Sequence, residues 1–407
     1  MSSRPPSPTT ADAAMLPPLP AAPPVIRLLV PANIRHNSGG NVYNAALAQG
    51  LEQLGTEVTV QPVVGNWPVG SKEERRRLAG LLSSVTTAGT QTGRPAGVPA
   101  NTITIVDGLV ASGAPEAMEA AAAAGHAPWV LLHMPLDEHP DLEARALRAA
   151  AGVICTSGSA AAEISRRHGL AGVRAALPGT KRGPVAAGSV PPRLLAVAAL
   201  LPNKDQLVLL GALARLQDME WTAALVGSAT ADPDYARQVT AAVDRYGLGS
   251  RVQLPGELTG DALERQWDDA DLSLLVSRVE AFGMAVTESV ARGVPVIVRA
   301  GTGAVEALGL GAEAAQEPPD GAGPALPGAA VELGSEPETG EADPEPLAAL
   351  LRSWLTDPGL RAEWRRRALA GRELLPGWDA TARQVLGYVA PKASSGGHSS
   401  QPAAGGE

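Results

Sequence analysis

The sequence predicts an α/β protein built from two similar halves, each with a parallel sheet covered by helices. Two observations support this prediction. Short apolar runs alternate with helical stretches along most of the chain, and the alternation restarts near residue 193, after a connection at 179–192. Strands that alternate with helices form parallel sheets with both faces covered. The 407 residues are enough for two domains of ordinary size.

The first half begins with an apolar run at residue 25. Its strands are rich in Val, Ile and Leu, and its first helix stops at Gly55, since glycine commonly ends helices. The predicted strands are 25–30, 57–60, 102–106, 129–132 and 152–155, and the predicted helices include 41–54, 115–124 and 141–150.

The second half repeats the pattern. Its predicted strands are 193–198, 221–226, 252–254, 272–276 and 294–298, and its predicted helices are 205–216 and 235–246. Residues 310–346 are acidic and rich in Pro and Gly, which predicts a long surface excursion. A last helical region is expected at 357–389.

Composition limits the classes of function. The net charge of −9 argues against a general nucleic-acid binder, which needs a basic surface. The single cysteine, Cys155, excludes an internal disulfide and fits a reducing compartment. We find no signal-peptide pattern, no apolar run long enough to cross a membrane and no zinc-type cluster. We therefore expect a cytoplasmic protein, with peripheral contact at the inner membrane face left open.

Residues 277–298 contain the most informative motif. Glu280 and Glu288 are carboxylates with seven residues between them, and Gly283 follows the first of them. The pattern predicts a loop, a helix, a turn and a buried strand. The amides of Phe282, Gly283 and Met284 would open the helix, where unpaired N–H groups favour anions. Two carboxylates beside an anion cradle suit a sugar nucleotide; the plain alternative is a surface helix with two solvated glutamates.

This stretch resembles the E-x7-E signature of retaining glycosyltransferases of family 4. Nearly every fixed position of that motif is met, although Ser289 stands where the family usually has alanine. The resemblance implies the GT-B fold, in which two Rossmann-like domains face each other across a cleft. It implies an acceptor domain at 25–185, a donor domain at 186–375 and a helix at 376–390 returning to the first domain. The low-complexity tails, 1–24 and 391–407, are expected to be disordered.

Two loops of the first half are candidate site segments. Gly39 and Gly40 precede a helix, where glycines allow a ligand close to the backbone, and with Tyr43 they resemble a donor-phosphate loop of the family. His133 follows a buried strand, and strand carboxyl ends face the ligand crevice in such sheets. By resemblance, His133 contacts the transferred sugar or orients the acceptor. Asp107 also ends a strand, and for it we favour a structural role.

The donor side resembles the family less closely. Lys204 is retained from a motif in which Arg and Lys neutralise the nucleotide diphosphate, but Ala199 stands where the Arg is usual. This departure removes one expected cation, so phosphate neutralisation would depend on Lys204 and backbone amides. Gly227 lies in a turn that resembles the one lining the nucleotide pocket of the family. Trp267 is expected in the core rather than stacked on the base.

The resemblance implies a hexosyl transfer (EC 2.4 type) from a nucleotide-diphosphate sugar to a hydroxyl acceptor, with no cofactor and no bound metal. Glu280 would contact the donor sugar and Glu288 the ribose; neither is expected to act as a covalent nucleophile. Lipid, glycan and metabolite acceptors all stay open. Two other hypotheses also stay open. One is a catalytically silent GT-B scaffold, which Ala199 favours, and the other is another GT-B enzyme such as an epimerase. The mixed-charge segment 72–78 is expected to be a solvated helix face, with membrane docking as its alternative.

Overall fold

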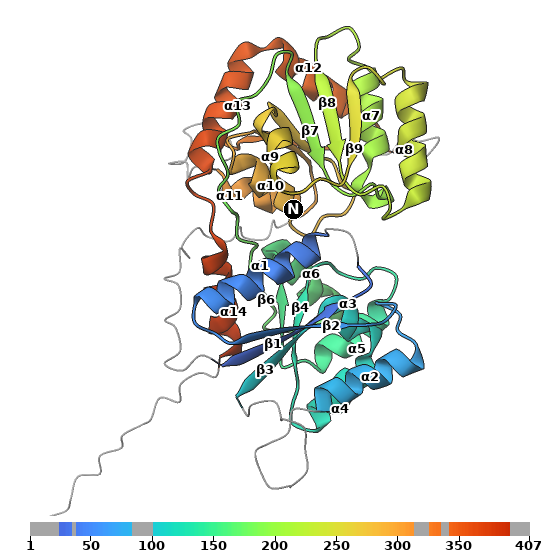
Figure 1. The fold of residues 1–407 in the computed structure, drawn as a ribbon, viewed down its shortest axis with the longest axis vertical. Helices are drawn as coiled ribbons and strands as arrows, with labels where there is room; N and C mark the ends of the chain where they lie inside the picture. The colour runs from blue at the N-terminus through green and yellow to red at the C-terminus, as the bar shows by residue number, and fades with distance from the viewer. Residues whose placement is uncertain (1–23, 35–37, 84–100, 313–324, 335–341, 391–407) are drawn as a thin grey trace, which may run out of the picture.

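The computed structural model describes residues 24–34, 38–83, 101–312, 325–334 and 342–390. The chain forms two lobes joined at a narrow waist, with the blue-to-green N-terminal half below and the green-to-red C-terminal half above (Figure 1). Each lobe contains one six-stranded sheet flanked by helices. The prediction of an α/β protein with two parallel-sheet halves is confirmed. The tails predicted at 1–24 and 391–407 lie outside the described residues, except for Pro24.

The first sheet has the strand order β2-β1-β3-β4-β5-β6, and all its pairings are parallel. Its strands are β1 (Val25–Pro31), β2 (Val58–Val63), β3 (Thr102–Asp107), β4 (Trp129–Leu132), β5 (Gly152–Cys155) and β6 (Arg174–Ala175). Its helices are α1 (Gly39–Gln53), α2 (Lys72–Ser83), α3 (Gly108–Gly113), α4 (Pro115–Ala123), α5 (Pro140–Arg148) and α6 (Gly158–His168). The order reverses between β1 and β3, so the loops after these two strands diverge.

The second sheet has the order β12-β11-β10-β7-β8-β9 and is also parallel. Its strands are β7 (Arg193–Val197), β8 (Thr222–Val226), β9 (Val252–Gly256), β10 (Leu272–Leu275), β11 (Val296–Arg299) and β12 (Gly328–Val331). Its helical elements are η1 (Pro202–Lys204), α7 (Gln206–Ala214), α8 (Pro233–Arg245), α9 (Gly260–Asp268), α10 (Met284–Val290), α11 (Ala304–Leu310), α12 (Glu345–Thr356) and α13 (Pro358–Gly371). Here the order reverses between β7 and β10.

The last helix, α14 (Trp378–Val389), leaves the second lobe and packs beside α1 on the first sheet (Figure 1). Val385 and Leu386 are buried there against Ile26 and Leu28. With aromatic residues at only 3% of the chain, both cores consist mainly of Val, Leu, Ile and Ala. Burial of these aliphatic side chains therefore supplies most of the apolar contacts in each lobe.

The structure corrects the sequence reading at several elements. The excursion predicted at 310–346 contains strand β12, which pairs with β11, so part of it belongs to the sheet. Helices α3, α6, α9, α11 and α12 were not named from the sequence; several are short or rich in Ala and Gly, which weakens the apolar period of a helix. Segment 72–78 does lie in a helix, α2, and exposed ion pairs join Glu73 to Arg76 and Arg77. In the described residues, we find no helix long and apolar enough to cross a membrane.

Candidate functional site

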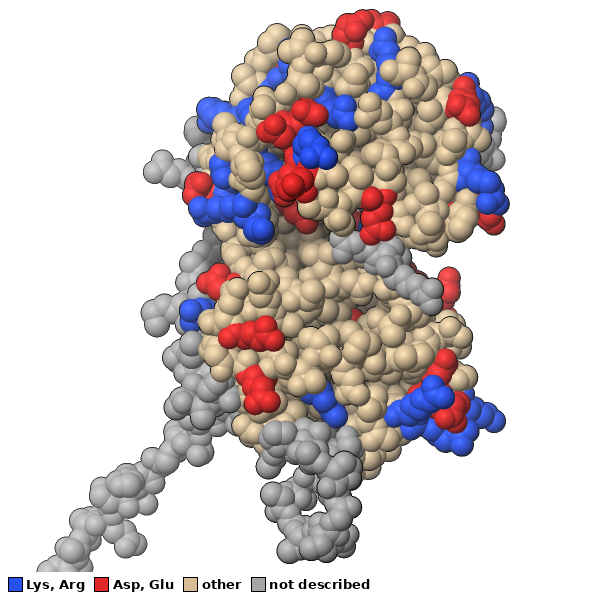
Figure 2. Space-filling view, in the orientation of Figure 1, with Lys and Arg blue, Asp and Glu red and all other residues tan. Residues whose placement is uncertain are grey.

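A cavity of about 450 Å³ lies between the lobes, and loops at the carboxyl ends of strands from both sheets line it. From the first lobe come the segments after β1, β3, β4 and β5, and from the second those after β7, β8, β9 and β10. The waist between the lobes is visible in Figure 2, where basic and acidic side chains lie in small mixed groups on the coloured face. Ligands of open α/β sheets bind at this edge, where the strand order reverses.

The second-lobe wall is built at its reversal point. Lys204 ends the turn after β7, and Glu280 lies in the loop after β10. The Lys204 Nζ atom is 2.7 Å from Glu280 Oε2, and both side chains are largely shielded, with 21% and 15% exposure. The alternative of two solvated surface glutamates is therefore wrong for Glu280. The fold brings together a cation and a carboxylate that are 76 positions apart in the sequence.

Asp205, next to Lys204, is an unexpected part of this wall. It is the one described residue other than glycine with a positive φ, 54°. Its buried carboxylate accepts hydrogen bonds from Arg278 at 2.9 and 3.1 Å and from Arg299 at 2.8 Å. The Arg278 amide also donates to Asn203 O at 2.8 Å. These contacts join the turn that carries Lys204 to the loop that carries Glu280.

Helix α10 begins where the sequence predicted. Gly283 precedes its first residue with φ 89°, a conformation that favours glycine, and a Cβ there would lie 2.9 Å from Leu275 Cδ2. Phe282 is buried in the core, while Phe282, Gly283, Met284 and Glu288 all line the cavity. Burial raises the pKa of the Glu288 carboxyl; Arg292 lowers it and Glu264 raises it to smaller extents.

Gly227 and Ala199 lie where two strand ends approach closely. A Cβ on Gly227 would come within 1.9 Å of Ala198 O, so this position needs glycine for backbone packing. Both Gly227 and Ala199 line the cavity. Among the lining residues that the structure describes, Lys204 has the sole Lys or Arg side chain, so no arginine there replaces the one missing at Ala199.

The first-lobe wall starts at helix α1. Ser38 caps this helix by accepting a hydrogen bond from the Asn41 amide at 3.2 Å, and Gly39 and Gly40 form its first two positions. A Cβ on Gly40 would lie 3.2 Å from His133 Cδ2. The absence of a side chain at Gly40 therefore leaves room for the His133 ring.

His133 belongs to a polar cluster with Asn44 and Asp107. Its Nε2 atom is 3.0 Å from Asn44 Oδ1 and 3.3 Å from Asp107 Oδ2. Asn44 Nδ2 donates to Asp107 Oδ2 at 3.0 Å, which orients the amide. Because both neighbours of Nε2 are then oxygens, we assign the ring proton to Nε2, and Nδ1 is the acceptor of the neutral ring.

Asp107 has both the structural role that the sequence predicted and a place in the cavity lining. It caps α3 by accepting from the Leu109 amide at 2.9 Å, as a structural role requires. It also lines the cavity and contacts His133. Asn44 was missed altogether, although it lies four positions after Gly40 and hence on the same helix face.

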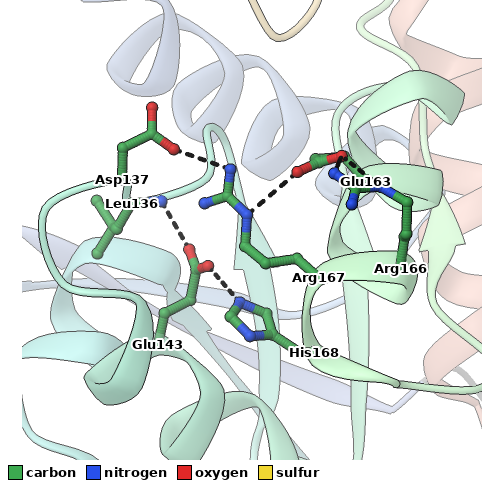
Figure 3. A network of polar contacts seen from close by, with 7 residues as sticks. All are labelled: Leu136, Asp137, Glu143, Glu163, Arg166, Arg167 and His168. Carbon is green, nitrogen blue, oxygen red and sulfur yellow. Dashed lines mark hydrogen bonds and ion pairs between the residues drawn. The ribbon is translucent and has the colours of Figure 1, made fainter.

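Buried polar contacts hold the loop after His133 in place. Glu143 Oε1 accepts from the Leu136 amide at 2.8 Å, and its Oε2 lies 2.6 Å from His168 Nε2 (Figure 3). Both side chains are buried. Beside them, Arg167 bonds to Asp137 and Glu163 (Figure 3). This network holds the loop that carries His133 and Leu136 in one position.

A carboxylate of the second lobe also reaches the first lobe. Glu306, on α11, accepts hydrogen bonds from the amides of Gly158 and Ser159 at 2.8 and 2.9 Å. These amides open helix α6, and such N–H groups favour a negative charge. The bridge connects the lobes at the edge of the waist.

Trp267 is buried, with 1% exposure, and its expected place in the core is confirmed. Among the described residues, no group of three or more His, Cys, Asp or Glu side chains is arranged to hold a metal ion. The roles assigned to the site residues from the sequence stay predictions.

Residues 180–319 match the family model described as glycosyl transferases group 1. This stretch contains strands β7 to β11 and most of the second-lobe wall of the cavity. The chain therefore has a group 1 glycosyltransferase domain. No curated protein is significantly similar to the chain.

Three solved structures illustrate the fold. Sucrose-phosphate synthase from Thermosynechococcus elongatus is 20% identical, with a TM-score of 0.64, over 89% of this chain and 97% of that one. HepE from Anabaena, in complex with UDP and glucose, is 16% identical, with a TM-score of 0.63, over 90% and 99%. A glycosyltransferase from Rickettsia africae is 16% identical, with a TM-score of 0.63, over 90% and 98%. This likeness confirms the prediction of a GT-B fold, and the domain match confirms the prediction of a glycosyltransferase.

Proposed function

We propose that the chain is a retaining glycosyltransferase of the family 4 type, which moves a sugar from a nucleotide-diphosphate sugar to a hydroxyl acceptor without a bound metal. One observation supports this most directly. The Lys204–Glu280 pair and the His133–Asp107 pair, from different lobes, line a single cavity large enough for such a donor.

On the donor side, Lys204 and the amides of Gly283 and Met284 would hold the diphosphate. Fixed charge and oriented dipoles stabilise a leaving phosphate through electrostatic preorganisation. Lys204 is paired with Glu280, so donor binding would exchange that contact for a phosphate on Lys204 and a sugar hydroxyl on Glu280. Glu288 would accept hydrogen bonds from the ribose hydroxyls.

The transfer itself would take place on one face of the sugar. The bond from the anomeric carbon to the phosphate oxygen breaks, and a bond to the acceptor oxygen forms on the same side. The acceptor proton passes to the departing phosphate oxygen. Nδ1 of His133 would accept a hydroxyl hydrogen bond, and Asp107 and Asn44 would orient the ring.

The first test is a thermal-shift titration with UDP-, GDP- and ADP-sugars in the presence of EDTA. A ligand that binds the native state raises its apparent stability by mass action. UDP-sugars have priority, because HepE is described in complexes with UDP and UDP-glucose. Stabilisation by one nucleotide class, followed by a product with the anomeric configuration of the donor, is the expected result. An inverted product would contradict the retaining mechanism.

A matched variant tests the site. Glu280→Ala should abolish transfer and leave the fold intact, because Glu280 lies in a loop and is partly accessible. Wild-type turnover in that variant would contradict the assignment of Glu280. Glu220→Ala, which removes an exposed glutamate of the second lobe that lines neither hollow, is the control and should keep wild-type turnover.

The second candidate function is a catalytically silent scaffold, and Ala199 favours it because one expected cation is absent. Failure of every nucleotide sugar to stabilise the protein would support this alternative. A change of the donor sugar without transfer would indicate an epimerase instead. We propose the cytoplasm as the place of action, since Cys155 is a free, buried thiol. Peripheral contact at the inner membrane face would be made through α2 and is tested by vesicle sedimentation.

A further inference from the structure

Four apolar side chains lie on the first-lobe side of the cavity. Ile34, Leu109, Met134 and Leu136 line it, and we call these four residues the apolar wall. None of them is buried, and Met134 is 41% exposed. Large apolar side chains at the surface of a concave site are typical of ligand pockets, because a ligand removes them from water.

The apolar surface continues beyond the main cavity. An adjoining hollow of about 330 Å³ shares Met134, Leu136 and Asn203 with it and is also lined by Pro68, Pro135 and Val279. Val279 belongs to the second lobe, is 43% exposed and directly precedes Glu280. The hollow therefore starts beside the residue that would hold the transferred sugar.

Contacts within the protein hold the loop that carries Leu136 in place. The Leu136 amide donates to the buried carboxylate of Glu143, which is itself paired with His168 (Figure 3). A buried, fully paired carboxylate fixes the backbone that it accepts from. A preformed wall lowers the ordering cost of binding an apolar ligand.

The charges around the hollow are acidic. Its rim includes Asp137, Glu138 and His139, and no Lys or Arg is among the described residues that line it. Asp137 is paired with Arg167 at 2.8 Å, whereas the structure records no ion pair for Glu138. Lys204, on the donor side, is already paired with Glu280. An acceptor carrying phosphate or carboxylate near this hollow would meet these carboxylates and no Lys or Arg among the described lining residues.

We infer that the acceptor is an uncharged hydroxyl compound with an apolar body, and that this body lies along the apolar wall and in the adjoining hollow. The inference rests on the proposed glycosyl transfer and names the substrate class of its acceptor side. The acceptor hydroxyl would lie beside His133 and Glu280, where the donor sugar is held. The continuity of the hollow with the cavity identifies the acceptor, rather than a second protein, as its occupant.

The test compares simple glucosides as acceptors, with the full-length protein and the nucleotide sugar that stabilises it. The probes are octyl glucoside and nitrophenyl glucoside, which have apolar bodies, methyl glucoside, which lacks one, and glucose phosphate, which is charged. Product formation is followed by mass spectrometry, and binding in the presence of the nucleotide by calorimetry. We expect kcat/KM or affinity at least about tenfold higher for the apolar glucosides than for methyl glucoside, and none detectable for glucose phosphate.

A variant links the preference to the wall. Leu136→Ser should reduce the preference for octyl glucoside over methyl glucoside about tenfold, and the ratio of the two kcat/KM values is the readout. Val64→Ser is the matched control, because Val64 is 67% exposed in the first lobe and lines neither hollow. Equal use or binding of methyl and octyl glucosides, or preference for glucose phosphate, would overturn the inference. Absence of donor binding would instead refute the proposed function, so the two failures are distinguishable.

Discussion

Asp205 offers the sharpest test of how the donor side is built. The residue combines a left-handed backbone, at φ 54°, with a carboxylate that is only 3% exposed. Arg299, 14% exposed, and Arg278, 49% exposed, both donate to it. We predict that this clamp positions Lys204, the neighbouring residue, and that its removal weakens both stability and nucleotide binding.

The expected loss of stability follows from the ion pairs that Asp205 makes with Arg299 and with Arg278. Removal of one partner of a buried ion pair costs about 3–5 kcal/mol. The Arg278 part is small, because an exposed pair contributes roughly 0–1 kcal/mol, and Arg299 keeps a hydrogen bond to Leu333 O at 3.2 Å. We therefore expect Asp205→Ala to cost about 3 kcal/mol, at the lower end of the buried range. Asp205→Gly should cost roughly 1 kcal/mol less, since glycine adopts the left-handed conformation without strain.

Thermal denaturation and UDP titration of both variants measure these effects. For a unit of 150–250 residues, each kcal/mol moves Tm by about 2–4 °C. Asp205→Ala should therefore melt about 6–12 °C below the wild type, and Asp205→Gly about 2–4 °C above Asp205→Ala. Asp205→Asn, which tolerates the same backbone, isolates the loss of charge. If the alanine variant were as stable as the wild type, the clamp would contribute nothing; if it lost stability but bound UDP normally, Asp205 would not position Lys204.

Three further predictions follow from single contacts. Gly40→Ala should lower turnover roughly tenfold or more by displacing the His133 ring, as small misplacements do. Gly80→Ala, whose Cβ would meet no atom within 4 Å, should not lower it, and equal loss of turnover in both variants would contradict this reason. Glu288 has a raised pKa in the folded protein, so its contribution to stability is complete below the unfolded pKa and is lost as pH rises through the folded value. The Tm of Glu288→Gln should consequently rise relative to the Tm of the wild type as pH rises. A difference in Tm that does not change with pH would contradict this prediction. Glu306→Ala should weaken the contact between the lobes by about 1–2 kcal/mol of free energy and increase the radius of gyration measured by X-ray scattering. An unchanged radius of gyration would contradict this prediction.

Much of the second-lobe site could be predicted from the sequence, because its residues lie in local motifs. Glu280, Gly283, Met284 and Glu288 are neighbours along one loop and helix, so local spacing already places them together. Gly39 and Gly40 were found for the same reason, as the first residues of a helix after a strand. Even here the sequence did not reveal that Glu280 is paired with Lys204 rather than free in solvent.

The sequence by itself determined the alternation of strands and helices, the two halves and the start of α10, because the period of apolar residues and the positions of glycine are local properties. Only the tertiary structure decided which loops meet. His133 and Asn44 are 89 positions apart, and Asp205 and Arg299 are 94 apart, yet each pair is joined by a hydrogen bond. Strand order and the placement of the lobes determine such contacts, and no local pattern encodes them. The acidic hollow and the Glu306 bridge likewise exist because the two lobes face each other.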